Sequence, residues 1–223
     1  MKVLKQAKEE IVKIAKKMYL SGMVNIFEGN VSMRLEDRYL ITPSQQSKED
    51  MTEDMIIEID AGGKILNPSE KYKPSSEVKM HLEVYRLRPD VNAVVHCHST
   101  YATAYAVAGK PIQTQALTEM LLIFGEIPLV PYGTPGTERI YAGFEEHLVN
   151  NNAVLLANHG VLTVGDTLLN AYSIAEAVEK LAQTLFYVKI LGGEQPIPEE
   201  EARMIRSYGE QMRKAAINSK RNP

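Results

Sequence analysis

Between residues 4 and 20, apolar side chains recur every three or four positions, which is the spacing of one face of a helix. The apolar positions are Leu4, Ala7, Ile11, Ile14, Ala15 and Met18. A similar pattern predicts two long amphipathic helices over residues 167–191 and 198–217, separated by a pair of glycines and a proline-containing stretch. Shorter helices are expected at about 74–88, 99–109 and 137–150.

Short runs rich in β-branched and other apolar residues predict strands between these helices. The expected strands cover residues 31–35, 39–42, 55–60, 64–66, 91–98, 112–115, 127–131, 154–159 and 161–164. Tight turns join the first strand to the second and the third to the fourth, and such hairpins favour a mixed or antiparallel sheet. Strands and helices interleave without a linker-like gap, so residues 1–223 are predicted to form one α/β domain with helices on the faces of a single sheet.

The composition excludes several classes of protein. A single cysteine, Cys97, rules out an intramolecular disulfide framework and a four-cysteine zinc site, and it suits a reducing compartment. A formal net charge of −3 gives no overall basic field that would attract nucleic acid. Apolar runs such as 153–157 are far shorter than the ~20 residues of a membrane span, and the N-terminus resembles neither a signal peptide nor a transit peptide. We therefore expect a soluble cytoplasmic protein without nucleic-acid or membrane partners.

Three of the five histidines fall at the ends of predicted strands. His96 and His98 are two residues apart in one strand, so their rings point to the same face, and His159 ends a second strand. Glu77 lies at the start of a predicted helix. Three neutral imidazoles and one carboxylate suit zinc or a similar divalent ion, whereas Ca²⁺ and Mg²⁺ favour oxygen ligands. These residues form a candidate metal site, although two histidines in one strand are more often incidental.

The two remaining histidines admit other roles. His81 stands one helical turn after Glu77, so it could bind the same metal, orient the Glu77 carboxylate or simply pack against the sheet. His147 lies near the end of a predicted helix, where a positive charge is favourable, and is interpreted as structural.

Polar residues that could hold an anion stand next to Glu77. Ser75 and Ser76 precede it at a helix N-terminus, whose free N–H groups favour negative charge. The other candidates, at two polar turns beside strand ends, are Gly29, Asn30, Ser44 and Gln45. Each feature alone is usually a cap or a turn, but together they could clamp a phosphate beside the metal.

Six short motifs resemble the class II aldolase and adducin-head family, in particular its L-fuculose-1-phosphate aldolases and L-ribulose-5-phosphate 4-epimerases. The motifs are GNVS at 29–32, ITPS at 41–44, PSSE at 74–77, VVHCHS at 94–99, PYGTPGT at 131–137 and NHG at 158–160. They follow the family's order across nearly the whole chain. The resemblance implies a largely antiparallel sheet with helices on both faces, and a homotetramer with active sites at subunit contacts.

The resemblance also implies which residues form the site. Glu77, His96, His98 and His159 would bind one Zn²⁺ per subunit, whereas His81 does not match a metal ligand of the family. The phosphate of a sugar phosphate would be held by Gly29, Asn30, Ser44, Gln45, Ser75 and Ser76. The family commonly has glycine at the position of Gln45, and the larger side chain here would narrow the pocket.

Three residues match positions with acid–base roles in the family. Glu77 matches a glutamate that transfers a proton as well as binding metal, and Tyr208 matches a tyrosine on the aldehyde side. Glu119 stands where the fuculose-phosphate aldolases have tyrosine, and a glutamate there resembles the base of the methylthioribulose-1-phosphate dehydratases. As alternatives, Tyr208 could be an ordinary tyrosine of an amphipathic helix and Glu119 a solvated charge.

The resemblance therefore implies a zinc-dependent aldolase that cleaves a ketose 1-phosphate, L-fuculose 1-phosphate or a relative, to dihydroxyacetone phosphate and an aldehyde. One alternative is a methylthioribulose-1-phosphate dehydratase, and another is an L-ribulose-5-phosphate 4-epimerase, which usually has aspartate at the position of Glu77. A non-catalytic scaffold like the adducin head would tend to lack the metal histidines. A Schiff-base aldolase is disfavoured because no lysine lies in an apolar strand.

Overall fold

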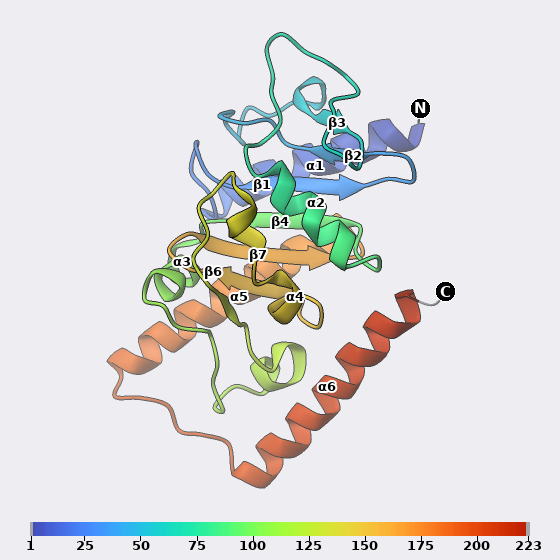
Figure 1. The fold of residues 1–223 in the computed structure, drawn as a ribbon. Coiled ribbons are helices and arrows are strands. Elements are labelled where there is room, and N and C mark those ends of the chain that lie inside the picture. Colours follow the sequence, from blue (N-terminus) through green and yellow to red (C-terminus); the bar gives the residue numbers. More distant parts are fainter. Residues whose placement is uncertain (1, 222–223) are drawn as a thin grey trace.

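Within residues 2–221, which the computed structural model describes, the chain forms a seven-stranded sheet (Figure 1). The strands are β1 (Asn30–Arg34), β2 (Tyr39–Ile41), β3 (Ile57–Ile59), β4 (Ala93–Cys97), β5 (Leu129–Val130), β6 (Ala153–Leu156) and β7 (Gly160–Gly165). Their order across the sheet is β3-β2-β1-β4-β7-β6-β5. Each neighbouring pair is antiparallel except β5 and β6, which are parallel, so the expected mostly antiparallel sheet is confirmed.

Helices of very different length connect these strands. They are α1 (Lys2–Leu20), α2 (Val78–Leu87), α3 (Thr100–Val107), α4 (Phe144–His147), α5 (Leu168–Ile190) and α6 (Glu199–Arg221). Single turns of 3-10 helix form η1 (Glu53–Met55) and η3 (Glu138–Tyr141), and a π-helical turn forms η2 (Met120–Phe124). No helix within residues 2–221 is long and apolar enough to cross a bilayer.

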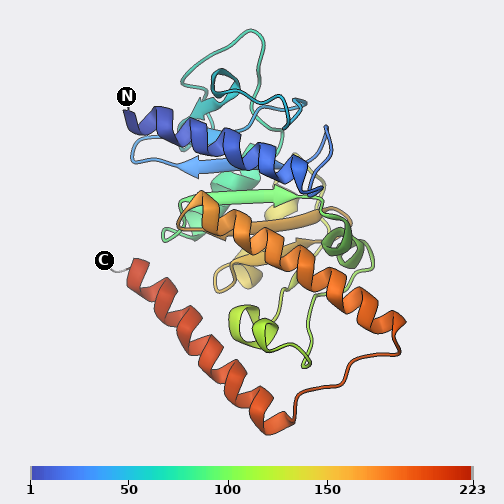
Figure 2. The same cartoon turned by 180° about the vertical axis from the view of Figure 1, so that it is seen from behind.

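The two larger apolar cores lie on opposite faces of the sheet. Val95 points into the core shared with α1, α3 and α5, whereas its neighbour Val94 points into the core shared with α2 and α4. Figure 1 shows α2 and α4 in front of the sheet, and Figure 2, from behind, shows α1 and α5 across the other face. Helix α6 stands apart from both cores and packs on η2, where Arg213 Nη1 donates to the Leu122 carbonyl at 2.7 Å.

The structure corrects three of the expected elements. The segment 137–150 is not one helix: η3 ends at Tyr141, and Gly143 is the N-cap residue of the separate helix α4. Residues 64–66 and 112–115 form no named strand and contribute one bridge each, through Ile65 and Ile112.

Helix α2 begins at Val78, later than expected, and Glu77 rather than a serine is its N-cap residue. The segment before it is held beside β2: Ser75 N donates to the Thr42 carbonyl at 3.2 Å, and Pro43 and Pro74 form a bridge. This pairing keeps the residues before Glu77 out of the helix.

The position of β4 explains where the site lies. Because β4 runs between β1 and β7, His96 pairs with Asn30 on one side and Leu162 on the other. The end of β4, the start of β1 and the turn before β7 therefore meet at one edge of the sheet. Cys97 points to the opposite face and is buried in the core, as the alternation of the strand predicts.

Candidate active site

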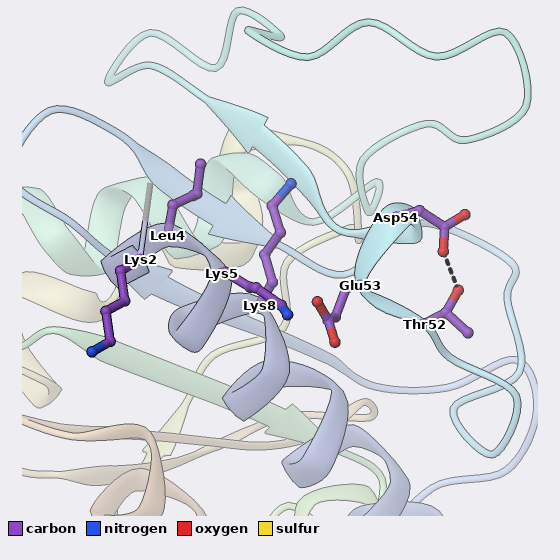
Figure 3. A pocket seen from close by; sticks show the side chains of 7 residues that line it. All are labelled: Lys2, Leu4, Lys5, Lys8, Thr52, Glu53 and Asp54. Carbon is purple, nitrogen blue, oxygen red and sulfur yellow. Dashed lines mark hydrogen bonds between the residues drawn. The ribbon is translucent and has the colours of Figure 1, made fainter.

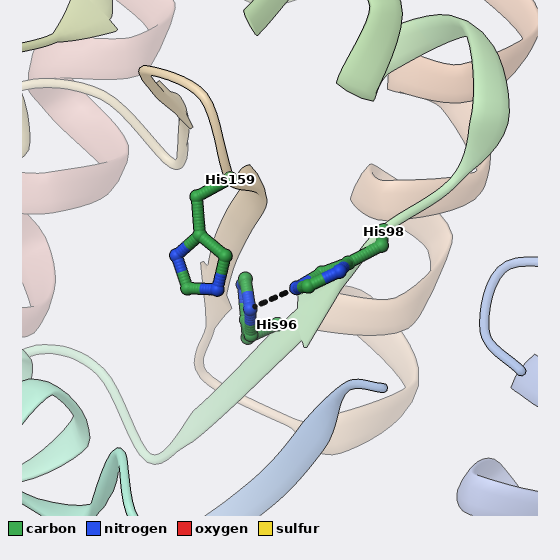
Figure 4. A group of neighbouring side chains, drawn as sticks. All are labelled: His96, His98 and His159. Carbon is green, nitrogen blue, oxygen red and sulfur yellow. Dashed lines mark hydrogen bonds between the residues drawn. The ribbon is translucent and has the colours of Figure 1, made fainter. Parts of the chain in front are cut away.

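Three histidines converge at this edge of the sheet (Figure 4). His96 lies on β4, His98 follows its end, and His159 precedes β7. Their candidate ligand nitrogens all lie within 4.8 Å of one another. His96 is fully buried, and the other two rings are partly buried. The structure thus brings together the three residues that the sequence proposed as metal ligands.

The hydrogen bonding of His96 fixes which of its ring nitrogens is bare. His96 Nδ1 lies 2.9 Å from the carbonyl oxygen of Val161, which can only accept, so Nδ1 carries the proton and Nε2 is bare. His96 Nε2 lies 3.0 Å from His98 Nε2. Burial lowers the pKa of His98 to about 4, and it also lowers the pKa values of His96 and His159. Neutral imidazole, the form that binds metals, is therefore favoured at neutral pH.

Glu77 completes the cluster from the N-terminus of α2. Its Oε2 lies 3.4 Å from His96 Nε2 and accepts a hydrogen bond from Asn30 Nδ2 at 2.7 Å. Its Oε1 lies 3.4 Å from His159 Nε2. Among the residues that the structure describes, this buried Oε1 atom has no hydrogen-bond partner.

These four residues fit a divalent metal ion. A buried carboxylate oxygen without a donor is unfavourable in the absence of a cation. A cation among the four residues would satisfy that oxygen. The donor set of three nitrogens and one oxygen matches zinc and similar ions rather than ions that prefer oxygen alone.

A cavity of 320 Å³ opens beside the histidines, and we call it the active-site pocket. It is lined by Phe27, Glu28, Gly29, Asn30, Pro43, Ser44, Gln45, Lys48, Ser75, Ser76, Glu77, His98, Pro135 and His159. All six residues expected to hold a phosphate are among them. Segments from three separate parts of the sequence thus place hydroxyl and amide groups next to the histidines and Glu77.

Lys48 is a pocket residue that the sequence analysis missed. It is only 2% exposed, and its Nζ donates to the Gln46 carbonyl at 3.3 Å. Burial lowers its pKa to about 8, with the charge of Glu28 acting in the opposite direction. Lys48 lies in an irregular loop before η1, where no periodicity signals burial. The sequence signal that could have indicated Lys48 is its position four residues after Ser44, an expected phosphate-binding residue.

Close backbone packing around the pocket requires two glycines. A Cβ atom on Gly29 would lie 2.9 Å from the carbonyl oxygen of His96, and a Cβ on Gly160 would lie 2.8 Å from His98 Cδ2. Gly29 also has a φ of 73°. Gln45 adopts a φ of 55°, a region that favours glycine, so this exposed residue holds a strained backbone at the pocket mouth.

Two expected catalytic residues lie elsewhere. Tyr208 is 59% exposed on α6, Glu119 is exposed at the start of η2, and neither lines the active-site pocket. Their segments pack on each other, since Gly209 of α6 lies against Leu122 of η2. The helix that carries Tyr208 therefore packs on the turn that follows Glu119, and both residues lie outside the active-site pocket.

A larger cavity, of 830 Å³, lies between α1 and η1 (Figure 3). Several of its lining residues already have partners: Lys8 pairs with Glu58 at 2.7 Å, Lys5 pairs with Glu9 at 3.6 Å, and Thr52 donates to Asp54. No histidine and no unpartnered buried polar atom is among its lining residues. We therefore assign the chemistry to the histidine cluster.

Comparison with known proteins bears on the chemistry of this cluster. Residues 9–186 match the model of the class II aldolase and adducin N-terminal domain family. A 5-deoxy-D-ribulose 1-phosphate aldolase of Bacillus thuringiensis is 35% identical over 94% of this chain and 100% of its own. An L-fuculose phosphate aldolase of Haemophilus influenzae is 36% identical over 85% of this chain and 86% of its own.

Two further matches widen the range of reactions. A 3-oxo-tetronate 4-phosphate decarboxylase of Escherichia coli is 33% identical over 88% of this chain and 92% of its own. A solved structure of an L-fuculose 1-phosphate aldolase superposes with a TM-score of 0.82 at 30% identity, covering 91% of this chain and 95% of that one. The chain belongs to the class II aldolase and adducin N-terminal domain family, and it is an aldehyde-lyase enzyme of that family.

Proposed function

We propose that this enzyme is a zinc-dependent aldolase that cleaves a ketose 1-phosphate to dihydroxyacetone phosphate and an aldehyde. L-Fuculose 1-phosphate and 5-deoxyribulose 1-phosphate are the substrates to test first, because relatives at 35% and 36% identity carry those names. The observation that carries the proposal is the unpartnered Oε1 of Glu77, which faces three neutral histidines at the edge of a pocket lined with hydroxyl groups.

The phosphate is proposed to bind in the active-site pocket opposite the metal ligands. Ser44, Ser75 and Ser76 supply hydroxyl groups, and Gly29 shapes the neighbouring loop. Lys48 supplies a buried amine, and burial lowers its pKa although the charge of Glu28 opposes that shift. A phosphate dianion would be a strong anionic partner for it, and a charge-assisted hydrogen bond between them would be short and strong. The exposed Gln45 borders the entrance.

Cleavage requires one proton to move from oxygen to carbon. When the C3–C4 bond breaks, its electron pair stays on C3, the C4 hydroxyl loses its proton, and C4 becomes the aldehyde carbon. We assign Oε1 of Glu77 to accept that proton and return it to C3. Zn²⁺ bound at the cluster would supply Lewis-acid chemistry and stabilise the negative charge that cleavage leaves on the substrate's oxygens.

The aldehyde half of the substrate is proposed to meet a neighbouring subunit. Tyr208 on α6 and Glu119 at the start of η2 are both exposed, α6 packs on η2, and neither residue lines the pocket of its own chain. Met204, Tyr208 and Met212 recur every four residues and are exposed, which is a pattern suited to a subunit contact. In a homotetramer, this surface would bring Tyr208 and Glu119 into the next subunit's site.

A decarboxylase acting on a 3-oxo sugar acid phosphate is the second candidate, because a relative with that activity is 33% identical over 88% of this chain. Loss of CO₂ from such a substrate also leaves negative charge on an enolate oxygen, so the same cluster would serve. The aldolase is preferred because the match to the deoxyribulose-phosphate aldolase covers that relative's whole length.

One experiment separates these activities. Metal-analysed enzyme is incubated with ketose 1-phosphates, a 3-oxo-tetronate 4-phosphate, methylthioribulose 1-phosphate and L-ribulose 5-phosphate, and the products are identified by mass and chromatography. Chelator-sensitive release of dihydroxyacetone phosphate is expected. Release of CO₂, loss of water or epimerisation without carbon–carbon cleavage would each replace the aldolase proposal with the corresponding alternative.

A further inference from the structure

A line of buried polar side chains runs behind Glu77, away from the active-site pocket. Asn30 and Ser32 share one face of β1, and His81 and Tyr85 share one face of α2. All four are nearly inaccessible, with exposures of 5%, 1%, 1% and 3%. We call these four residues the buried network.

The buried network is continuous from Tyr85 to Glu77. Tyr85 Oη lies 2.7 Å from Ser32 Oγ, and Ser32 Oγ lies 2.6 Å from His81 Nδ1. His81 Nε2 forms a short hydrogen bond with Asn30 Oδ1. Asn30 Nδ2 then donates to Glu77 Oε2 at 2.7 Å. Each link joins β1 to α2, so the helix and the strand are held in one register.

The chemistry of the end groups fixes the direction of every donor. The Glu77 carboxylate can only accept, so the NH₂ group of Asn30 faces it and the amide oxygen faces His81. That oxygen also only accepts, so His81 carries its proton on Nε2. His81 Nδ1 is therefore an acceptor for the Ser32 hydroxyl, and Ser32 in turn accepts from Tyr85.

The burial of His81 prevents the hydrogen bonds of the network from reversing their direction. Burial lowers the pKa of His81 to about 3, so the ring stays neutral and retains a single proton. A neutral ring with its proton on Nε2 can donate to Asn30 and accept from Ser32 at the same time. The opposite tautomer would leave the Asn30 oxygen without a donor in a site that excludes water.

We propose that Asn30, Ser32, His81 and Tyr85 form a one-way hydrogen-bond network that holds one oxygen of Glu77 and thereby aims its other oxygen at the histidine cluster. The network pins Oε2 through Asn30, while Oε1 is left 3.4 Å from His159 and without a hydrogen-bond partner among the described residues. His81 and Ser32 are positioning residues, since they act through Asn30 and line no part of the pocket.

The effect of the buried network on turnover rests on the proposed function. Its effect on metal binding does not, because the orientation of Glu77 also governs how tightly a metal ion is held. Residues that orient a metal ligand typically change metal affinity or activity by about 10- to 100-fold when they are replaced. Metal affinity and histidine tautomers can be measured without any substrate. The network can therefore fail while the aldolase proposal stands, and the reverse also holds.

The first test is the tautomer of His81 in the metal-free protein. Nitrogen-15 NMR of histidine-labelled enzyme distinguishes protonated from bare ring nitrogens, and the spectrum of a His81→Gln variant assigns the His81 signals. We expect a neutral ring with the proton on Nε2. A proton on Nδ1 would overturn the proposal, because His81 could then not donate to Asn30.

The second test measures Zn²⁺ affinity by competition with a chromophoric chelator in four variants. His81→Leu removes both hydrogen bonds of the ring, and it should weaken Zn²⁺ binding about 10- to 100-fold. His81→Gln keeps a donor for Asn30 and should recover part of the loss. Ser32→Ala deletes one oxygen without changing the helix, and it should weaken binding less than His81→Leu does.

Met80→Ala is the matched control for disturbed packing. Met80 precedes His81 on α2 and is fully buried in the core, but it belongs to no polar contact of the network. This variant should lose stability and keep its Zn²⁺ affinity. In the zinc-loaded enzyme, the network variants should lower kcat while leaving the KM for substrate within about twofold, because the pocket that holds the phosphate is intact.

Two outcomes would overturn the proposal. In the first, His81→Gln and Ser32→Ala both bind Zn²⁺ as tightly as the parent enzyme, which remains decisive even if His81→Leu does not fold. In the second, Met80→Ala weakens Zn²⁺ binding as much as the network variants do, which would reduce the buried network to ordinary packing.

Discussion

The side-chain amide of Asn30 donates to Oε2 of Glu77 at 2.7 Å, across 47 positions of sequence. This contact links the first strand of the sheet to the N-terminus of α2, directly beside three histidines. It fixes one oxygen of the carboxylate and leaves the other free. The two oxygens of Glu77 therefore have different surroundings, and Oε1 is the one left without a hydrogen bond among the described residues.

Removal of metal should lower both activity and thermal stability. Zn²⁺ at about 1,000 times its Kd stabilises a folded protein by about 4 kcal/mol, and this corresponds to a rise in Tm of about 10 °C for a chain of this size. Differential scanning fluorimetry with and without chelator measures the shift. His159→Asn should abolish it, whereas His147→Asn, outside the cluster, should keep it. An equal Tm with and without Zn²⁺ would contradict the metal site.

Subunits that are inactive for different reasons should complement each other. Glu77→Gln removes the proposed base from a subunit's own pocket, and Tyr208→Phe removes the hydroxyl that it lends to its neighbour. An equal mixture of the two variants is unfolded and refolded together, so that their subunits combine at random. If the site is shared between subunits, the mixture should regain about a quarter of the parent activity. Mixed tetramers no more active than the separate variants would show that Tyr208 does not act across a subunit contact.

Lys48→Met should raise the KM for a phosphorylated substrate about 10- to 100-fold, because one charge-assisted hydrogen bond contributes roughly 1.5–3 kcal/mol. Zn²⁺ affinity should not change, and Lys48→Arg should retain part of the binding. In the parent enzyme, the KM should rise above pH 8 as free Lys48, whose pKa is lowered to about 8, loses its proton. Steady-state kinetics over pH 6–10, about two pH units either side of that pKa, measures the KM of the variants and the pH dependence of the parent's KM. A Lys48→Met enzyme with an unchanged KM would remove Lys48 from the phosphate site.

Gln45→Gly should be more stable than Gln45→Ala by about 1 kcal/mol. Residue 45 has a left-handed backbone, which is strained for alanine but not for glycine, because glycine has no Cβ atom. Both variants remove the side chain, so their difference isolates the backbone. Urea denaturation of the two metal-free proteins provides the measurement. Greater stability of the alanine variant would show that residue 45 does not hold a positive φ in solution.

The stability of the metal-free enzyme should fall below pH 6.5, in part because of His81. In the unfolded chain His81 takes up a proton near pH 6.5, but in the folded protein burial lowers its pKa to about 3. The unfolded state therefore binds more protons between these values, and the free energy of unfolding decreases as pH falls. Between pH 6 and 4, the free energy of unfolding of the parent should fall by about 1.4 kcal/mol per pH unit more than that of His81→Gln. Parallel slopes for the two proteins would contradict a neutral buried His81.

The sequence by itself determined most elements and the residue types of the site. Helical spacing located α1 and α5, and the alternation of the strand placed His96 and His98 on one face, with Cys97 in the core. The family motifs indicated the candidate metal ligands and the hydroxyl groups beside them. These signals are local: a helix repeats every 3.6 residues, a strand every two, and a motif spans a few adjacent positions.

Tertiary structure decided how these residues are connected, because burial and strand register depend on residues far apart in sequence. The pairing of Asn30 with His96 places the Asn30 amide between Glu77 and His81, so the His81 ring forms its hydrogen bond with Asn30 rather than with the Glu77 carboxylate. Burial of Lys48 depends on a loop without periodicity. The packing of α6 on η2 places Tyr208 away from its own pocket, and no local pattern could show that.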